Sequence, residues 1–228
     1  MLEHAAGQYD EIVCCGDLVG YGARPNEVAE WCAGNLRACV RGNHDKVATG
    51  LDDMEGYNLV AMASLEWTRK QLTSQVADYL RGLPRGPLEY KQLWLMHGSP
   101  IDEDLYLVQE CDAYGMESYL PAPVGFFGHT HRQGGFSYSM RRCRGLAPVG
   151  LRQEESTMVL SPASWYLINP GSVGQPRDGD PRASYAIYEP TERLVRYCRV
   201  HYDIAAAAAE IRKAGLPDLL ARRLESGR

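Results

Sequence analysis

Short hydrophobic runs alternate with longer amphipathic stretches through the first 130 residues of the chain. Each run contains a β-branched or aromatic residue, which favours a buried strand over a helix fragment. The runs cover residues 11–15, 38–40, 93–96 and 124–127. Stretches with helical periodicity cover residues 25–33, 57–72 and 74–80 and, less distinctly, 111–119. Strands that alternate with helices predict a largely parallel sheet, because parallel neighbours need crossover connections.

The pattern changes after residue 131. Strand-like segments separated by turn residues cover positions 134–140, 156–160, 164–168, 184–188 and 194–200. This succession predicts an antiparallel meander, and two helices, over 203–214 and 217–224, follow it. Because no internal repeat and no Ser- or Gly-rich linker interrupts the sequence, we expect residues 1–228 to form one domain with a parallel and an antiparallel half.

Composition places the chain among ordinary globular proteins. Its 228 residues are 45% hydrophobic and 23% charged, which allows a sizeable core. The net charge of −5 provides no general basic surface for nucleic acid or an anionic membrane. No apolar run approaches the roughly 18 residues that a membrane helix needs, and residues 1–11 do not resemble a signal peptide. Seven scattered cysteines without a C-x-x-C pair predict a reducing compartment, so we expect a soluble cytoplasmic protein.

Residues that can bind metals follow each of the four early strands. The segments are Gly16-Asp17, Arg41-Gly42-Asn43-His44-Asp45, His97-Gly98 and Gly128-His129-Thr130-His131. In open α/β sheets, ligands bind at the carboxyl ends of the strands. Imidazole, carboxylate and amide groups are ligands for divalent cations. Two cations about 3.5–4 Å apart can hold a phosphoryl group and activate water without a Ser or Cys nucleophile. The pattern therefore indicates a metal centre.

Taken in order, these segments resemble the signature motifs of the calcineurin-like metallophosphoesterase superfamily. The matching blocks are Gly16-Asp17-x4-Gly22, Gly42-Asn43-His44-Asp45, His97 and Gly128-His129-x-His131. A later block, Asn169-Pro-Gly-Ser-Val-Gly, resembles the bacterial and archaeal phosphodiesterase branch. The resemblance implies an α/β sandwich of two mixed β-sheets flanked by helices.

The resemblance also implies a ligand set for two divalent cations, either Mn, Fe, Zn or Ni. Asp17 would bridge the two cations. Asn43, His97 and His129 would complete one cation site with Asp17, and His131 would belong to the other.

Three further residues receive roles in the reaction from the same resemblance. His44 would contact the phosphate and protonate the leaving oxygen, and Asp45 would orient His44. Arg41 occupies the place of an arginine that contacts substrate phosphate in the Ser/Thr protein phosphatases. The implied reaction is hydrolysis of a small phosphate ester by a hydroxide that two cations activate.

Two departures from the family pattern stand out. The family opens with a strand that ends in Asp-x-His, whose two residues bind the same cation as His131, and this sequence contains no Asp-x-His. We therefore expect the N-terminal strand to be missing, and residues 1–6 to match the end of the helix that follows it. Protein phosphatases carry Asp and Arg where this chain has Gly20 and Tyr21, which disfavours that branch.

Several functional alternatives remain open from the sequence. We expect a phosphodiesterase, with phosphomonoester hydrolysis as the alternative reaction. A non-catalytic scaffold is a further alternative, because one coat subunit of membrane trafficking keeps this fold without the catalytic histidine, whereas this chain retains His44. The turn-rich segment 169–182 is expected at the rim of the site, where Arg177 or Arg182 would meet a phosphate. The basic cluster at 141–144 is expected at an exposed hairpin tip, and the oligomeric state is left open.

Overall fold

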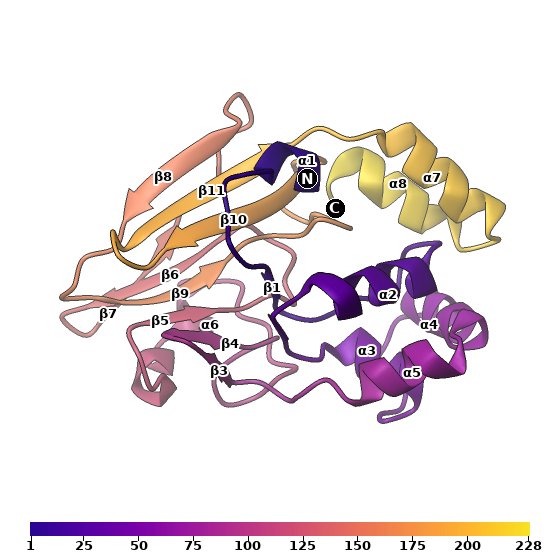
Figure 1. The fold of residues 1–228 in the computed structure, drawn as a ribbon, viewed down its shortest axis with the longest axis horizontal. Coiled ribbons are helices and arrows are strands. Elements are labelled where there is room, and N and C mark those ends of the chain that lie inside the picture. Colours follow the sequence, from indigo (N-terminus) through magenta and orange to yellow (C-terminus); the bar gives the residue numbers. More distant parts are fainter.

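The computed structural model describes residues 1–228, with the strands gathered on one side of the molecule and most helices on the other (Figure 1). The largest sheet has six strands. In order across the sheet they are β3 (Leu88–Tyr90), β4 (Leu93–Leu95), β5 (Val124–Phe126), β9 (Trp165–Asn169), β6 (Gly134–Ser139) and β7 (Arg142–Leu146). β4, β5 and β9 are parallel, and the remaining pairs are antiparallel. The carboxyl ends of β4 and β5, which precede His97 and His129, therefore lie at the same edge.

A second sheet packs against the first and completes a sandwich (Figure 1). It contains three antiparallel strands in the order β10 (Ala183–Glu189), β11 (Leu194–Val200) and β8 (Glu155–Val159). A separate parallel pair consists of β1 (Val13–Cys14) and β2 (Ala38–Cys39). The α/β fold with mixed sheets and flanking helices is therefore confirmed.

The central strands are hydrophobic on both faces because both faces of the large sheet are covered. Successive residues of a strand point to opposite faces. Phe126 and Ile168 pack between the two sheets with Tyr197 of β11. Their neighbours Phe127 and Leu167 belong to the core on the other face. Burial on both faces gives the continuous apolar runs that are typical of parallel strands.

The helices form two groups beside the sandwich. The first surrounds β1 and β2 and consists of α2 (Pro25–Asn35), α3 (Asn43–Thr49), α4 (Leu59–Gln71) and α5 (Ser74–Arg81). The second is the C-terminal pair α7 (Ile204–Lys213) and α8 (Asp218–Ser226). The short segments α1 (Leu2–Ala5), α6 (Glu110–Ala113) and the 3-10 helix η1 (Met116–Tyr119) lie outside these groups.

The starts of these helices follow from local sequence. Pro25 occupies the first turn of α2, where its missing N–H costs no hydrogen bond. The side chains of Asn58, Thr73 and Asp203 accept hydrogen bonds from backbone N–H groups at the starts of α4, α5 and α7. Such caps satisfy donors that the helix itself leaves unpaired.

The structure differs from the sequence prediction at three points. β9 is not part of a meander: it pairs in parallel with β5, and β6 pairs with its other edge. The basic cluster at 141–144 lies mostly in β7, an exposed edge strand, and only Arg141 lies in the turn. The helix α3 was not predicted at all, and it begins at Asn43 inside the ligand motif.

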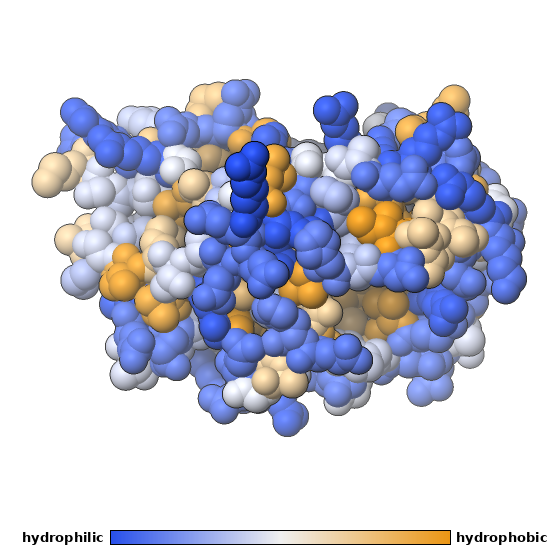
Figure 2. All heavy atoms as spheres, turned by 90° about the horizontal axis from the view of Figure 1, so that it is seen from above, coloured by the Kyte–Doolittle hydropathy of each residue, from blue (hydrophilic) through white to orange (hydrophobic).

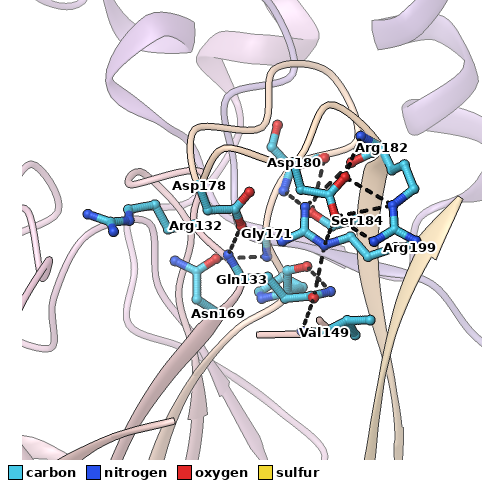
Figure 3. A network of polar contacts seen from close by, with 12 residues as sticks. Arg132, Gln133, Val149, Asn169, Gly171, Asp178, Asp180, Arg182, Ser184 and Arg199 are labelled. Carbon is cyan, nitrogen blue, oxygen red and sulfur yellow. Dashed lines mark hydrogen bonds and ion pairs between the residues drawn. The ribbon is translucent and has the colours of Figure 1, made fainter. Parts of the chain in front are cut away.

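A buried polar network connects the second sheet to the segment after β9 (Figure 3). Arg199 of β11 is only 2% exposed. Its guanidinium donates to the Gln133 side chain at 3.1 Å and pairs with Asp178, which also accepts the Gln133 backbone N–H at 2.9 Å. Arg182 and Asp180 form a second buried ion pair beside it. These contacts fix the segment that runs next to the loop carrying His131.

None of the helices has the length and apolar character needed to span a bilayer; the longest, α4, has 13 residues. The face of the molecule seen in Figure 2 is mostly hydrophilic. Hydrophobic side chains on that face lie in several small groups rather than in one patch.

The buried network predicts a large stability loss on replacing Arg199. In Arg199→Ala, Asp178 would keep a buried charge without its ionic partner, which costs about 3–5 kcal/mol of unfolding free energy. The matched control is Arg196→Ala on the same strand, whose ion pair with Glu155 is partly exposed and worth about 0–1 kcal/mol. Urea unfolding measures both. Equal effects from the two substitutions would contradict the importance of the network.

Candidate metal centre

Loops at the ends of four strands bring the five predicted metal ligands together. β1 leads to Asp17, β2 to Asn43, β4 to His97, and β5 to His129 and His131. Ligand atoms of Asp17, His97 and His129 all lie within 4.8 Å of one another. The Asn43 Oδ1 atom is 3.1 Å from His97 Nε2. The His131 Nε2 atom is 3.9 Å from Asp17 Oδ2, so the fifth residue faces the same centre.

In each of the three histidines, one ring nitrogen forms a hydrogen bond to a backbone carbonyl. His97 Nδ1 bonds to Cys15 at 2.7 Å, His129 Nε2 to Asp104 at 3.0 Å, and His131 Nδ1 to Gln175 at 2.8 Å. A carbonyl only accepts hydrogen bonds, so the bonded nitrogen carries the proton. A neutral ring then keeps a lone pair on its other nitrogen, as a metal-binding histidine requires.

His129 gives the clearest sign that a cation fits this site. Its Nδ1 atom is buried and has no hydrogen-bond partner. An unsatisfied buried polar atom costs roughly 1–3 kcal/mol, which a ligated cation would remove. A carboxylate oxygen, an amide oxygen and two imidazoles around one point form a donor set suited to Zn, Fe, Mn or Ni.

The two oxygens of Asp17 have different surroundings. Oδ1 accepts the backbone N–H of His44 at 2.9 Å. Oδ2 lies 3.4 Å from His97 Nε2 and 3.9 Å from His131 Nε2. The free oxygen therefore lies between the two histidines that the resemblance assigns to different cations. Of the two positions, only the one at His97 and His129 collects three imidazole or carboxylate ligands from this chain.

Charge within the centre is balanced between Asp17 and His97. Burial works against protonation of His97, but the Asp17 carboxylate outweighs it and raises the pKa of His97 to about 9. Burial likewise opposes ionisation of Asp17, yet His97 and His44 hold the pKa of its carboxyl well below the usual value. Burial lowers the pKa of His129 to about 3. A cation would thus take the place of the proton on His97.

Three candidate ligands have left-handed backbone conformations. The φ angles are 57° for Asp17, 59° for His129 and 57° for His131. Such angles cost an L-residue about 1–3 kcal/mol and persist where the surrounding structure enforces them. They turn the side chains sharply out of the strand ends toward the centre.

Asp45 supplies the constraint at Asp17. Its carboxylate accepts backbone N–H groups from Asp17, Leu18 and Gly42 at 2.9 Å each and from Val19 at 3.2 Å. Asp45 therefore joins the loop after β1 to the start of α3. The family resemblance implies that Asp45 orients the His44 ring. In the structure, its carboxylate oxygens instead accept these backbone N–H groups.

The same two loops approach so closely that Gly42 cannot carry a side chain. A Cβ atom there would lie 2.0 Å from Asp17 Oδ1. Glycine at this position permits the backbone contact that Asp45 then holds.

Asn169 constrains the loop that carries His129 and His131. Its Nδ2 atom donates to the Gly128 carbonyl and to Thr130 Oγ1, both at 2.9 Å. The sequence contained a signal for this role, the Asn-Pro-Gly-Ser block, but its turn-rich composition indicated only a chain of turns. Asn169 is thus a positioning residue that the sequence interpretation missed.

His44 lies on the first turn of α3, between aromatic rings and a glycine. Its ring centroid is 4.4 Å from that of Tyr21 and 5.7 Å from that of Tyr57. Gly20 has a φ of 136°, and a Cβ atom on it would lie 2.3 Å from His44 Nδ1. Burial lowers the pKa of His44 to about 4. Gly20 and Tyr21, the two positions at which this chain differs from the protein phosphatases, therefore both lie against the His44 ring.

A cleft of about 400 Å³ opens beside Asn43, His44 and His129. Tyr106 is one of its walls and stacks on the His129 ring with centroids 3.6 Å apart. Its lining also includes Tyr21, Asp52, Tyr57, Asp104, Arg177 and Arg223. The metal centre thus faces a space large enough for a substrate.

The structure places two arginines that were expected to meet phosphate away from this cleft. Arg41 donates from Nε at 3.0 Å and from Nη2 at 2.8 Å to the carboxylate of Glu103. Arg182 is buried in its pair with Asp180. A guanidinium held in this way by a carboxylate has its strongest donors occupied. Arg177, the other arginine expected at the rim, lines the cleft.

Comparisons with known proteins agree with this geometry. Residues 1–193 match the family model of the calcineurin-like phosphoesterase superfamily domain. The uncharacterized protein MJ0912 of Methanocaldococcus jannaschii is 33% identical over 221 residues, covering 96% of this chain and 87% of that protein. A metallophosphoesterase from Sphaerobacter thermophilus superposes with a TM-score of 0.84 at 35% identity, covering 100% of this chain and 92% of that one. The hypothetical protein PH1004 of Pyrococcus horikoshii OT3 shares the fold, with a TM-score of 0.75, 17% identity and coverages of 100% and 90%.

Asp45→Asn tests whether the backbone contacts of Asp45 form the metal centre. The amide group would face some of the four N–H donors with its own N–H₂, so we expect the unfolding free energy to fall by about 2–4 kcal/mol. Cation affinity should fall roughly 10–100-fold, as for other residues that orient ligands. Urea unfolding with a chelator and calorimetric titration with Mn²⁺ measure the two effects. The control is Asp10→Asn at an exposed position; unchanged cation affinity in Asp45→Asn would contradict the assignment.

Proposed function

Since the chain belongs to the calcineurin-like phosphoesterase superfamily and is a metal-dependent phosphoric ester hydrolase, we propose that it hydrolyses phosphodiesters. The reaction would use two divalent cations, with His44 as the general acid. The observation that carries this proposal is the position of Asp17 Oδ2, 3.4 Å from His97 Nε2 and 3.9 Å from His131 Nε2.

Four residues of the chain would hold one cation, and two would contribute to the second. Asp17, Asn43, His97 and His129 form the first set, and Asp17 and His131 form the second. When bound, the cations would lower the pKa of water so that hydroxide is available as the nucleophile, and they would neutralise charge on the phosphoryl oxygens.

The protein's part is to keep these ligands in place and aimed at the cleft. Asp45 and Asn169 hold the loops of Asp17 and His129 through hydrogen bonds to backbone and side-chain atoms. Tyr106 covers one face of the His129 ring. Preorganised ligands avoid reorganisation when charge develops in the transition state.

His44 would donate a proton to the leaving oxygen. It lines the cleft beside Asn43 and His129, and its Nδ1 atom is buried without a partner. Burial disfavours the charged ring, whereas a bound anionic phosphate would favour it. The ring would therefore take a proton from solvent as substrate binds and release it readily to the leaving oxygen.

The size of the cleft favours a diester over a monoester. A phosphodiester carries organic groups on both sides of phosphorus, and the cleft of about 400 Å³, which is lined by Tyr21, His44 and Tyr57, has room for both. The presence of His44 within the cleft also supports an enzyme over a non-catalytic scaffold.

We infer a cytoplasmic location from the cysteines. All seven are free thiols, and three of them, Cys32, Cys39 and Cys198, are buried. Free thiols in this number suit a reducing compartment.

Two substrates with the same chromophore test the reaction. With Mn²⁺, Fe²⁺, Zn²⁺ or Ni²⁺ supplied separately, bis(p-nitrophenyl) phosphate should be hydrolysed with at least a tenfold higher kcat/KM than p-nitrophenyl phosphate. The opposite preference would replace the diesterase by a monoesterase. Protein that holds the cation and hydrolyses neither ester would favour the scaffold.

His44→Ala tests the general acid. We expect kcat to fall roughly 10²–10⁴-fold, the usual contribution of acid–base catalysis, with the cation content intact. Kinetics and elemental analysis of the same samples provide the measurement, and His201→Ala at an exposed position is the control. Loss of cation in His44→Ala would instead make His44 a ligand.

A further inference from the structure

The C-terminal helices lie directly over one wall of the cleft. The buried face of α7 and α8, which includes Leu220 and Leu224, packs with Tyr21, Val60 and Trp67. In Figure 1 this pair lies above α2 and α4, at the far end of the molecule from β7. The pair also lies beyond residues 1–193, the part of the chain that the family model matches. Its contribution to the cleft is therefore not contained in the family's motifs.

The end of α8 is fixed to the loop that carries Arg177. The Gly179 N–H donates to the Gly227 carbonyl at 2.9 Å. Gly227 has a φ of 64°, and a Cβ atom on it would lie 2.6 Å from the Asp180 backbone. These contacts hold together the two segments that carry Arg177 and Arg223, and both arginines line the cleft.

Arg177 is held rigidly beside the metal centre. Its backbone N–H donates to the His131 carbonyl at 3.0 Å. Its guanidinium donates to Gln175 Oε1 from Nε at 3.1 Å and from Nη2 at 2.9 Å. The guanidinium carbon lies 5.4 Å from the centroid of the Tyr21 ring, within the range of a cation–π contact. No carboxylate lies within ion-pair distance of it.

Arg223 is a second half-buried arginine without an acidic partner. The adjacent Arg222 differs: it is exposed and pairs with Asp218 at 2.6 Å. Burial raises the pKa of Tyr21, and the charges of Arg177 and Arg223 both oppose this rise. Positive charges that are partly withdrawn from water and lack a counter-ion favour an anionic ligand.

Other residues that line the cleft have the opposite charge. Asp52 and Asp104 are among them, and Lys46 pairs with them at 3.3 and 2.5 Å. An anionic group on the substrate would therefore be repelled by these carboxylates and attracted to the arginines.

From these positions we propose that Arg177 and Arg223 bind a second anionic group of the substrate, across the cleft from the scissile phosphate. The proposal rests on the proposed function and narrows it: the preferred substrate is a phosphate ester that carries a further phosphate or carboxylate. The basic wall recognises either group, because both accept paired hydrogen bonds from a guanidinium.

Competitive inhibition of bis(p-nitrophenyl) phosphate hydrolysis tests this assignment. The inhibitors are orthophosphate, pyrophosphate and tripolyphosphate, with phosphonoacetate and 3-phosphonopropionate as carboxylate analogues, all at one free-cation concentration. The readout is the ratio of the inhibition constant of each two-ended anion to that of orthophosphate, which cancels effects on the centre itself. We expect Arg177→Gln and Arg223→Gln each to raise this ratio about tenfold. Arg222→Gln is the matched control, expected to keep the ratio and the turnover of the wild-type protein.

The outcomes separate the two proposals. A raised ratio for the polyphosphates alone assigns the wall to a second phosphate, and a raised ratio for the phosphonocarboxylates alone assigns it to a carboxylate. An unchanged ratio in both arginine variants overturns the inference, even where the diester is hydrolysed. If the diester is not hydrolysed, the proposed function fails. In that case, calorimetric titration of cation-loaded protein with the same anions gives dissociation constants. The ratio of each two-ended anion's dissociation constant to that of orthophosphate then tests the role of the arginines.

Discussion

The carboxylate of Asp45 holds together the two loops on which the metal centre depends. It is fully buried, and a buried carboxylate is tolerated only when its oxygens are satisfied. Here backbone N–H groups of two separate loops satisfy them. The arrangement keeps Asp17 at a positive φ and brings its Oδ1 atom onto the first turn of α3. The direction of its Oδ2 atom toward the histidines follows from these two restraints.

Most of the fold could be predicted from the sequence because its elements have strong local patterns. The strand β11 occupies residues 194–200 as predicted, since its hydrophobic and polar positions identify it without reference to its neighbours. The pairing of β9 was wrong, because its apolar run suits either a meander or a place in the parallel sheet. Its place in the parallel sheet follows from the hydrophobic cores that cover both faces of β9, and the local sequence does not specify these. The helix α3 was missed because its seven residues coincide with a motif whose glycine and asparagine resemble a loop.

The candidate ligands could be found from the sequence since each directly follows a predicted strand. The partners that position them could not. Asp45 bonds to residues 26–28 positions away, and the partner of Arg41 is Glu103, 62 positions later. No local pattern encodes such contacts. The same holds for Arg223, which reaches the cleft only because the C-terminal helices fold back over Tyr21.

The segment after β9 is rich in glycine and proline, as a surface turn is, yet its attachments to the rest of the protein leave no room for insertions or deletions. Asn169, the last residue of β9, bonds to the loop of His129. Further along, the Gln175 carbonyl accepts from the His131 ring, and Gly179 bonds to the end of α8. One inserted residue would break the spacing between these attachments. The turn at Met140 and Arg141 has no such attachments, so length variation among relatives should concentrate there. A segment that composition marks as the most variable is thereby constrained like a core strand.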